Sequence, residues 1–329
     1  MRIRFCWFCY GHASTFSSKA RADPNVRKKH EHFSRFLLLF LPGLFPGGKR
    51  KYRTFVPRKK TTSPPMDSEK KDTLLLNVVQ CDIPPLPVEE RLSRCREFLA
   101  WGPQADLWIF PETFATGFSF PPPPETPHLG RTIREWLHET AECYHTAICG
   151  STLVEDNGRY FNRFFLVDAS GREQTYDKRH LFSYGHEDRY IAPGHSRELW
   201  ELHGWKIMPS VCYDLRFPVW SRNDRYYDLL LCVANWPESR IAAWDTLLRA
   251  RAIENMAYVA GANRVGRDSL DSLHTGHSVI LTPLGKPLAG EGPATEECIL
   301  SASISLPRIR TLRDKYGFLE DRDRFSIEE

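Results

Sequence analysis

The sequence lacks an apolar run long enough to cross a membrane. The run over residues 36–45 is short, is interrupted by Pro42 and Gly43, and lies too far into the chain for a well-formed secretory signal. The nine cysteines are odd in number and widely spaced, which argues against a disulfide scaffold and indicates a reducing compartment. Cys6 and Cys9 form a lone CxxC motif without a second pair, so a zinc or redox site has little support.

Acidic residues are scarce at the start of the chain. Residues 1–65 contain 15 Lys or Arg and, as acids, only Asp23 and Glu31, whereas the remaining 264 residues carry 30 basic and 39 acidic groups. The mildly acidic body lacks the basic surface that nucleic-acid binding requires. We therefore expect no nucleic-acid partner.

The composition changes sharply near Met66, which follows TTSPP and begins a segment of ordinary globular composition. The basic, acid-poor segment before it has the composition of an organellar transit peptide. We predict a disordered basic extension over residues 1–72 and a single domain over residues 73–329. The cytoplasm is the expected location, or an organelle if the extension acts as a transit peptide.

From residue 73 onward, strand patterns alternate with helix patterns. Short apolar runs predict strands over residues 74–80, 107–110, 147–153, 160–167, 205–211, 229–233, 258–262, 278–281 and 298–304. Apolar residues at helical spacing predict helices over residues 89–101, 129–143 and 241–256. The alternation predicts an α/β fold, and periodicity alone does not decide between one sheet and two.

Glu112 is the first of three reactive side chains that follow predicted strands. Catalytic groups of α/β proteins gather on such loops. Glu112 lies two residues beyond Phe110, where partial desolvation would raise the pKa of its carboxyl and make it a useful base. Taken alone, an exposed loop carboxylate is the more common explanation.

Lys178 lies among apolar side chains in the loop YDKRHLF, and Glu187 follows nine residues later. A lysine beside a reacting carbonyl stabilises the negative charge that develops on its oxygen. Taken alone, a surface lysine paired with Asp177 or Asp188 is the more common arrangement.

Cys212 ends an apolar run in VCYDLR, where a predicted strand meets charged residues. A buried free cysteine is commonly inert, but a thiol at a strand end acts as a nucleophile when a neighbouring base removes its proton. Glu112, Lys178 and Cys212 follow one another on successive loops, and this combination favours the nucleophile.

Glu112, Lys178 and Cys212, in this order, resemble the catalytic set of the nitrilase superfamily of carbon–nitrogen hydrolases. The blocks FPETFATGF, YDKRHLF, VCYDLRFPVWSRN, VANWP and RARAIENMAYVAGANRVG resemble its omega-amidase branch, and the resemblance covers residues 74–315. It implies a four-layer α-β-β-α sandwich that forms homodimers through helices flanking the sheets. It also implies that the domain uses no metal and no organic cofactor.

The resemblance implies a role for each of these residues. Cys212 would be the nucleophile, Glu112 the general base, and Lys178 the oxyanion stabiliser together with the backbone N–H of Tyr213. Glu187 matches a second glutamate that positions the site. The implied reaction is hydrolysis, through a thioester, of the terminal amide of α-ketoglutaramate or α-ketosuccinamate.

Such a substrate needs a cation for its carboxylate and walls for its short carbon chain. Arg216, four residues after Cys212, offers a guanidinium that binds a carboxylate through two hydrogen bonds. Tyr213 is expected beside it, with Trp236 and Phe118 as walls. The alternative for Arg216 is a structural ion pair with Asp214 or another loop acid, and the alternative for the two aromatic residues is ordinary core packing.

Other functions remain open from the sequence. A papain-like protease would pair Cys212 with a histidine, for which four are available: His180, His186, His274 and His277. A redox protein would need a resolving thiol, of which Cys232 is the nearest in sequence after Cys212. Within the same fold, the rivals are an amidase acting on deaminated glutathione or N-carbamoyl compounds and a catalytically silent scaffold.

Overall fold

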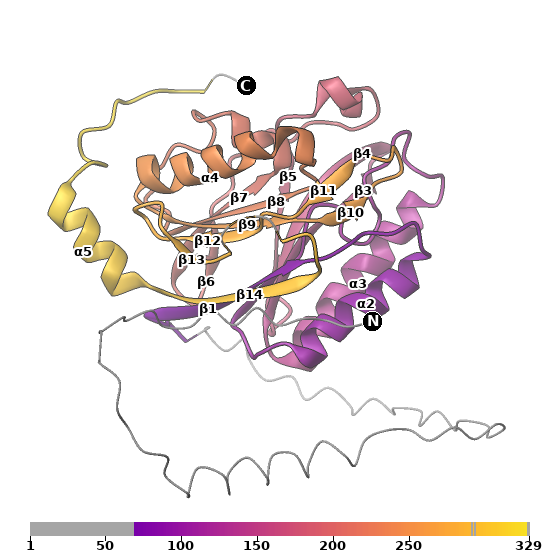
Figure 1. Cartoon of the computed structure of the whole chain (residues 1–329), viewed down its shortest axis with the longest axis horizontal. Coiled ribbons are helices and arrows are strands. Elements are labelled where there is room, and N and C mark those ends of the chain that lie inside the picture. Colours follow the sequence, from indigo (N-terminus) through magenta and orange to yellow (C-terminus); the bar gives the residue numbers. More distant parts are fainter. Residues whose placement is uncertain (1–68, 291, 293, 328–329) are drawn as a thin grey trace, which may run out of the picture. The chain divides into compact units, whose positions relative to one another are not determined.

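Two six-stranded sheets form the centre of the domain (Figure 1). The computed structural model describes residues 69–290, 292 and 294–327. The predicted extension over residues 1–72 therefore lies outside the described residues except for residues 69–72. In that short stretch the Lys71 N–H donates to the His203 carbonyl at 3.0 Å, and Lys71 Nζ lies 2.6 Å from Asp106 Oδ1. Lys71, two residues before β1, thus contacts the domain.

The first sheet has the strand order β14-β1-β2-β3-β4-β5. Strands β1, β2 and β3 are parallel, whereas β14, β4 and β5 each pair antiparallel with their neighbours. The bounds are β1 Thr73–Gln80, β2 Leu107–Ile109, β3 Ala147–Asp156, β4 Arg159–Val167, β5 Glu173–Asp177 and β14 Cys298–Ser305.

The second sheet has the order β13-β12-β9-β8-β7-β6, and β7, β8 and β9 are parallel. Its bounds are β6 Trp200–Leu202, β7 Trp205–Val211, β8 Leu229–Ala234, β9 Tyr258–Asn263, β12 Val279–Leu281 and β13 Pro287–Ala289. A separate hairpin pairs β10 Val265–Arg267 with β11 Leu273–Thr275.

Helices cover the outer face of each sheet (Figure 1). Helices α2 (Val88–Trp101) and α3 (Thr126–Tyr144) lie on the first sheet, and α4 (Ile241–Asn255) lies on the second. Helix α5 (Leu306–Tyr316) follows β14 and begins where the Ser305 side chain accepts a hydrogen bond from the Arg308 N–H. The predicted four-layer α-β-β-α sandwich is confirmed.

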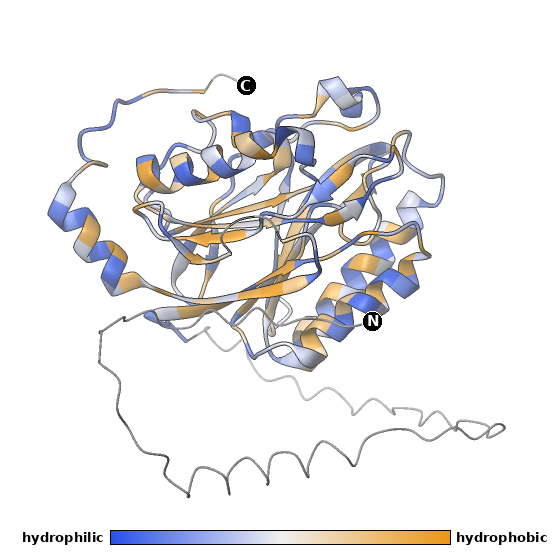
Figure 2. Cartoon of the chain, viewed as in Figure 1, coloured by the Kyte–Doolittle hydropathy of each residue, from blue (hydrophilic) through white to orange (hydrophobic). Residues whose placement is uncertain are grey.

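Strand alternation explains why the layers stack in this way. In β2, Leu107 and Ile109 belong to the core shared with the second sheet, whereas Trp108 belongs to the core beneath α2 and α3. Both faces of the sheet are therefore apolar, as in a sheet buried on both sides. Figure 2 shows the same pattern: apolar residues fill the strands, and polar residues alternate with them along α2 and α3.

The predicted strands and helices are present, with ends that differ by a few residues. The structure adds elements that the patterns did not predict, namely β5, β6, β10, β11, β13 and α5. Among the described residues, no helix is long and apolar enough to span a bilayer.

Candidate active site

The carboxyl ends of strands bring the predicted catalytic residues to one edge of the sandwich. Strands β2 and β5 run in the same direction because two antiparallel pairings, β3 with β4 and β4 with β5, separate β5 from β3. Glu112 lies three residues beyond β2, and Lys178 directly follows β5. Cys212 directly follows β7 in the second sheet and begins the 3-10 helix η3 (Cys212–Arg216).

Glu112, Lys178 and Glu187 form one buried cluster. Lys178 Nζ lies 2.9 Å from Glu112 Oε1 and 2.8 Å from Glu187 Oε2, and all three side chains are inaccessible to solvent. The structure therefore rules out the exposed alternative for Glu112 and the surface pair of Lys178 with Asp177 or Asp188. Asp177 instead pairs with Arg163 at 2.7 Å.

Lys178 attracts both carboxylates of this cluster, whereas the two carboxylates repel each other. Burial lowers the pKa of Lys178, but the nearby carboxylates of Glu112 and Glu187 outweigh it and raise the pKa well above its ordinary value. Lys178 therefore stays protonated. Burial also raises the pKa of Glu187, an effect that the Lys178 ammonium opposes and the Glu112 carboxylate reinforces.

Two asparagines that the sequence analysis did not identify hold the carboxylates. Asn162 in β4 donates from Nδ2 to Glu112 Oε1 at 2.8 Å and to Glu187 Oε1 at 3.4 Å. Asn235, just after β8, donates its backbone N–H to Glu112 Oε2 at 2.8 Å and its Nδ2 to the Glu112 carbonyl at 2.8 Å. Together with Lys178, these donors fix both oxygens of Glu112.

Cys212 occupies a strained turn. Its φ is 47°, in the left-handed region that residues other than glycine rarely adopt, and such strain gathers at functional sites. The side chain is partly buried. Burial and the negative charge of Glu112 raise the pKa of the thiol well above its ordinary value, while Lys178 opposes the shift. The resting thiol is therefore protonated and needs a base before it can attack.

Asp214 ties the nucleophile turn to the loop that carries Lys178. Its Oδ2 accepts the Val211 N–H at 3.0 Å and the Tyr176 hydroxyl at 2.8 Å. Its Oδ1 accepts the His180 backbone N–H at 2.8 Å. Because Val211 precedes Cys212 and the other two partners flank Lys178 in sequence, this buried carboxylate links both catalytic segments.

Comparison with known proteins now identifies the fold and chemistry. A family model described as carbon-nitrogen hydrolase matches residues 75–314. The chain belongs to the carbon–nitrogen hydrolase family. It is 40% identical over 259 residues to the omega-amidase YafV of Yersinia enterocolitica, a match that covers 78% of this chain and 99% of that protein.

Two further carbon–nitrogen hydrolase relatives agree with this assignment. The 2-oxoglutaramate amidase of Bacillus subtilis is 35% identical over 222 residues, which cover 66% of this chain and 85% of that protein. XC1258 from Xanthomonas campestris, a CN-hydrolase superfamily protein whose crystal structure carries an arsenic adduct in the active site, superimposes with a TM-score of 0.72. It is 36% identical, and the match covers 78% of this chain and 99% of that one. The predicted resemblance to the omega-amidase branch is confirmed.

The four predicted substrate-binding residues lie around this hydrolase site. The Arg216 guanidinium stands 5.0 Å from the Trp236 ring centroid, and Phe118 lies 5.5 Å from Lys178 Nζ. Tyr213 packs edge-on against Phe182, with ring centroids 5.3 Å apart. Trp236 is 3% exposed and belongs to the main core, so it also packs as an ordinary core residue, which was the alternative for it.

The predicted alternative for Arg216, an ion pair with Asp214, is absent from the described part of the chain. Asp214 instead contacts His180, whose Nδ1 lies 2.8 Å from Oδ1. His277 Nδ1 lies 3.0 Å from Asp245, and burial lowers the pKa of His274 to about 4. Burial raises the pKa of Cys232 to about 12, so it is a poor resolving thiol. These contacts favour neither a histidine-assisted protease nor a redox centre.

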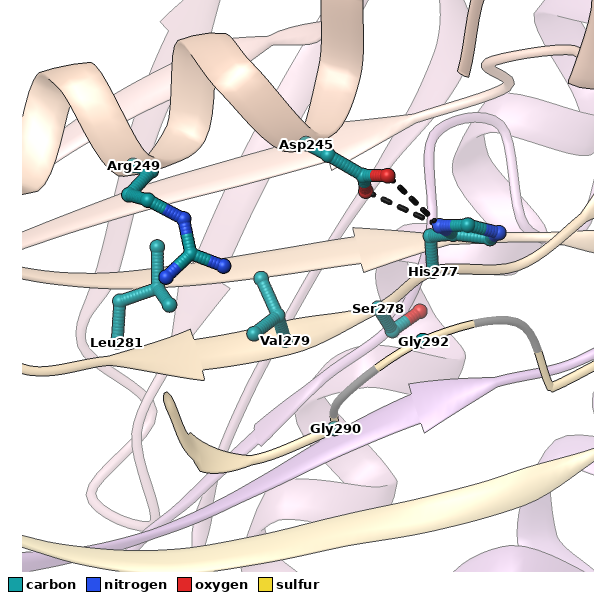
Figure 3. A pocket seen from close by; sticks show the side chains of 8 residues that line it. All are labelled: Asp245, Arg249, His277, Ser278, Val279, Leu281, Gly290 and Gly292. Atoms are coloured by element: carbon teal, nitrogen blue, oxygen red, sulfur yellow. Dashed lines mark hydrogen bonds and ion pairs between the residues drawn. The ribbon is translucent and has the colours of Figure 1, made fainter. Parts of the chain in front are cut away.

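A pocket lies between α4 and β12, and none of the predicted site residues lines it (Figure 3). Asp245 and Arg249 from α4 face His277, Val279 and Leu281 across it. Figure 3 shows His277 turned towards Asp245, and its Nδ1 lies within 3.1 Å of both carboxylate oxygens. Across the described residues, no group of three or more His, Cys, Asp or Glu is arranged to hold a metal ion.

Proposed function

We propose that this enzyme hydrolyses the terminal amide of short α-keto acid amides such as α-ketoglutaramate and α-ketosuccinamate, releasing ammonia and a dicarboxylic keto acid. The observation that carries the proposal is the buried contact of Lys178 with both Glu112 and Glu187, next to the protonated thiol of Cys212. The relatives named for omega-amidase and 2-oxoglutaramate amidase activity support the substrate class.

The first half-reaction forms a thioester. Cys212 Sγ attacks the amide carbon while Glu112 takes the thiol proton, so a tetrahedral intermediate forms with its negative charge on the former carbonyl oxygen. Lys178 and the backbone N–H of Tyr213 stabilise that oxygen. The C–N bond then breaks, Glu112 passes its proton to the departing nitrogen, and ammonia leaves.

The second half-reaction releases the acid. Glu112, again ionised, takes a proton from water as the water attacks the thioester carbon. The C–S bond breaks, and the proton returns to the Cys212 sulfur. Glu187 touches no reacting atom in this scheme and is a positioning residue: its two oxygens hold Lys178 Nζ at 2.8 and 3.1 Å, and the Phe182 N–H fixes Oε2 at 2.7 Å.

The carboxylate of the substrate binds at Arg216 in this proposal. Arg216 and the Trp236 ring form one side of the site, and Phe118 and Tyr213 form other walls. A bidentate contact orients the substrate so that its distal amide reaches Cys212.

The decisive experiment measures ammonia release from a panel of amides by the purified enzyme and its Cys212→Ala variant. The panel contains α-ketoglutaramate, neutral butyramide, deaminated glutathione and an N-carbamoyl amino acid. We expect the highest kcat/KM for the keto-acid amide and no turnover by the variant, with unchanged circular dichroism. Near-normal ammonia release by the variant would refute the mechanism. A preference of the parent enzyme for any other compound on the panel would refute the substrate.

We also infer a homodimer that uses the outer face of α4. The inner face of this helix is fully buried at Trp244, Leu248 and Ala252, yet Ile253 on the outside is 48% exposed and Leu284 nearby is 39% exposed. The other outward residues of α4, such as Asp245 and Arg249, are polar, so Ile253 and Leu284 form an apolar patch that a partner surface would cover. Sedimentation should report a dimer that Ile253→Glu converts to a monomer, whereas Val219→Glu, at another exposed apolar position, should leave it intact. A dimeric Ile253→Glu protein would refute this interface.

The cytoplasm is the proposed location, since six described cysteines are free thiols, as in reducing compartments: Cys81, Cys95, Cys143, Cys149, Cys212 and Cys232. If the N-terminal extension acts as a transit peptide, imaging the whole chain beside a chain that starts at Met66 will show the first in an organelle and the second in the cytoplasm.

A further inference from the structure

Two arginines at the site lack a carboxylate partner. Neither Arg216 nor Arg240 forms an ion pair with any residue that the structure describes, although both are partly buried. Four other arginines in the domain are paired with acids: Arg163 with Asp177, Arg197 with Asp224, Arg264 with Asp82 and Arg313 with Asp228. Arg91, Arg179 and Arg222 are also partly buried and lack an ion pair, so the missing counterion is not unique to Arg216 and Arg240. What sets these two apart is that both guanidiniums lie over aromatic rings near the catalytic residues, with no described hydrogen bond to either.

Each arginine lies over an aromatic ring, Arg216 over Trp236 and Arg240 over Phe182, and these two rings are termed the aromatic wall. Arg216 lies over the Trp236 ring at 5.0 Å, and Trp236 Nε1 donates to the backbone carbonyl of Arg240 at 2.8 Å. The Arg240 guanidinium in turn lies over the Phe182 ring at 5.1 Å. The two residues reach this wall from separate loops, one after β7 and one after β8.

Phe182 joins the aromatic wall to two catalytic segments. Phe182 holds Glu187 through its backbone N–H and contacts the ring of Tyr213, the residue after Cys212. Arg240 therefore stands one side chain away from the segment that carries the nucleophile. Its aromatic support holds the planar guanidinium while leaving its N–H donors free for a ligand.

Neither guanidinium forms an ion pair with a described acid. His274 is near enough to Arg240 for its pKa to be affected: burial lowers that pKa most, and the charges of Arg264 and Arg240 add to the effect. His274 is consequently neutral near pH 7, so it contributes no charge beside Arg240. An anionic group from outside the chain would complete the arrangement.

We propose that Arg240 is a second anion-binding residue of this site and that, with Arg216, it selects amides that carry a carboxylate. This inference rests on the proposed function and extends it, because it names the residue that separates keto-acid amides from neutral amides. Arg216 and Arg240 would contact the carboxylate and the adjacent keto oxygen from two sides of the wall. Each is a donor only, as these two oxygen acceptors require.

The test compares Arg240→Met with the parent enzyme on two amides. Methionine keeps much of the side-chain length over Phe182 while removing the charge and all donors. A charge-assisted contact of this kind corresponds to a loss of roughly 10- to 100-fold in kcat/KM. We expect that loss on α-ketoglutaramate to exceed the loss on butyramide at least tenfold. The inhibition constant of the product α-ketoglutarate, measured against butyramide, should rise by a similar factor.

Two further variants sharpen the result. Arg310→Met, on the exposed surface of α5, removes the same charge from the chain and should change neither ratio. In the double variant with Arg216→Met, the losses on α-ketoglutaramate should be non-additive if both arginines bind one ligand.

The outcomes separate this inference from the proposed function. If the parent enzyme shows no preference for the keto-acid amide, the proposed function fails. If the parent shows the preference and Arg240→Met retains it, or loses activity equally on both amides, the role of Arg240 is refuted and the proposed function stands.

Discussion

Replacing Lys178 with methionine tests the centre of the site. The ammonium contacts Glu112 at 2.9 Å and Glu187 at 2.8 Å, and nothing in this cluster is exposed to water. Lys178→Met leaves two buried carboxyl groups without their cation. Removing one partner of a buried ion pair costs about 3–5 kcal/mol of stability, because an uncompensated charge remains. We expect a loss of that size near pH 7.

The pH dependence of this loss has a defined sign. The pKa of Lys178 is raised in the folded enzyme, so its stabilisation is complete at neutral pH and is lost only as the pH rises through that raised value. In Lys178→Met, Glu187 loses the ammonium that opposes the rise of its pKa through burial and the nearby Glu112 charge. The resulting penalty applies above the unfolded glutamate pKa of about 4.3 and fades as Glu187 becomes protonated. The difference in unfolding free energy should therefore shrink as the pH falls from 7 to 4.

The assay combines urea unfolding at several pH values with steady-state kinetics. Loss of an oxyanion donor lowers kcat by about 100- to 1000-fold, with a smaller effect on KM, since the contact acts in the transition state. Lys206→Met, an exposed lysine in β7, is the matched control and should change neither quantity. A stability loss that does not vary with pH, or an effect confined to KM, would refute this account of Lys178.

Three further predictions follow from the same contacts. Glu112→Gln should slow both acylation and deacylation by about 100- to 10,000-fold, and a rapid-quench burst of ammonia at the parent rate would contradict a shared base. Asp214→Asn should lower kcat more than KM, because it disturbs hydrogen bonds to Val211 and Tyr176 without touching substrate; an effect on thermal stability alone would make its role purely structural. A chain beginning at Met66 should keep the parent melting temperature and turnover, and an insoluble or inactive product would move the domain boundary.

The strands that the sequence predicted are those with apolar side chains on both faces. Strand β4, for example, reads RYFNRFFLV and pairs on both sides, and its apolar content makes it recognisable as a strand. Strand β5 reads EQTYD and lies at the edge of its sheet, where only Tyr176 is fully buried. An edge strand of this kind carries no periodic signal. The sequence pattern does not predict helix α5 for a related reason: only Leu306 and Ile309 are buried, so the helix has little apolar periodicity.

The supporting residues of the site were harder to infer than the catalytic ones. Asn162 stands within an apolar strand, and a polar residue at such a place is itself a signal that something buried needs a donor. From the sequence, Asp214 is expected only as a partner for Arg216. Its observed partners Tyr176, in β5, and His180, in the loop after β5, lie far away in sequence. Sequence spacing does not say which strands adjoin across two sheets, so these contacts required the fold.

The buried cluster of Glu112, Lys178 and Glu187 and the arginines at the aromatic wall have opposite electrostatic effects on an anionic substrate. Inside, two carboxyl groups share one ammonium, and burial together with the charge of Glu112 raises the pKa of the Cys212 thiol and keeps it protonated. Such a centre repels an anionic substrate, and an anionic substrate is what the proposed reaction needs. Arg216 and Arg240 offset this repulsion at the aromatic wall, where they lack acids of their own. Added salt screens exposed charges, so it should weaken the binding of keto-acid amides more than the binding of neutral amides. The ion pairs of the buried cluster should be far less affected by salt.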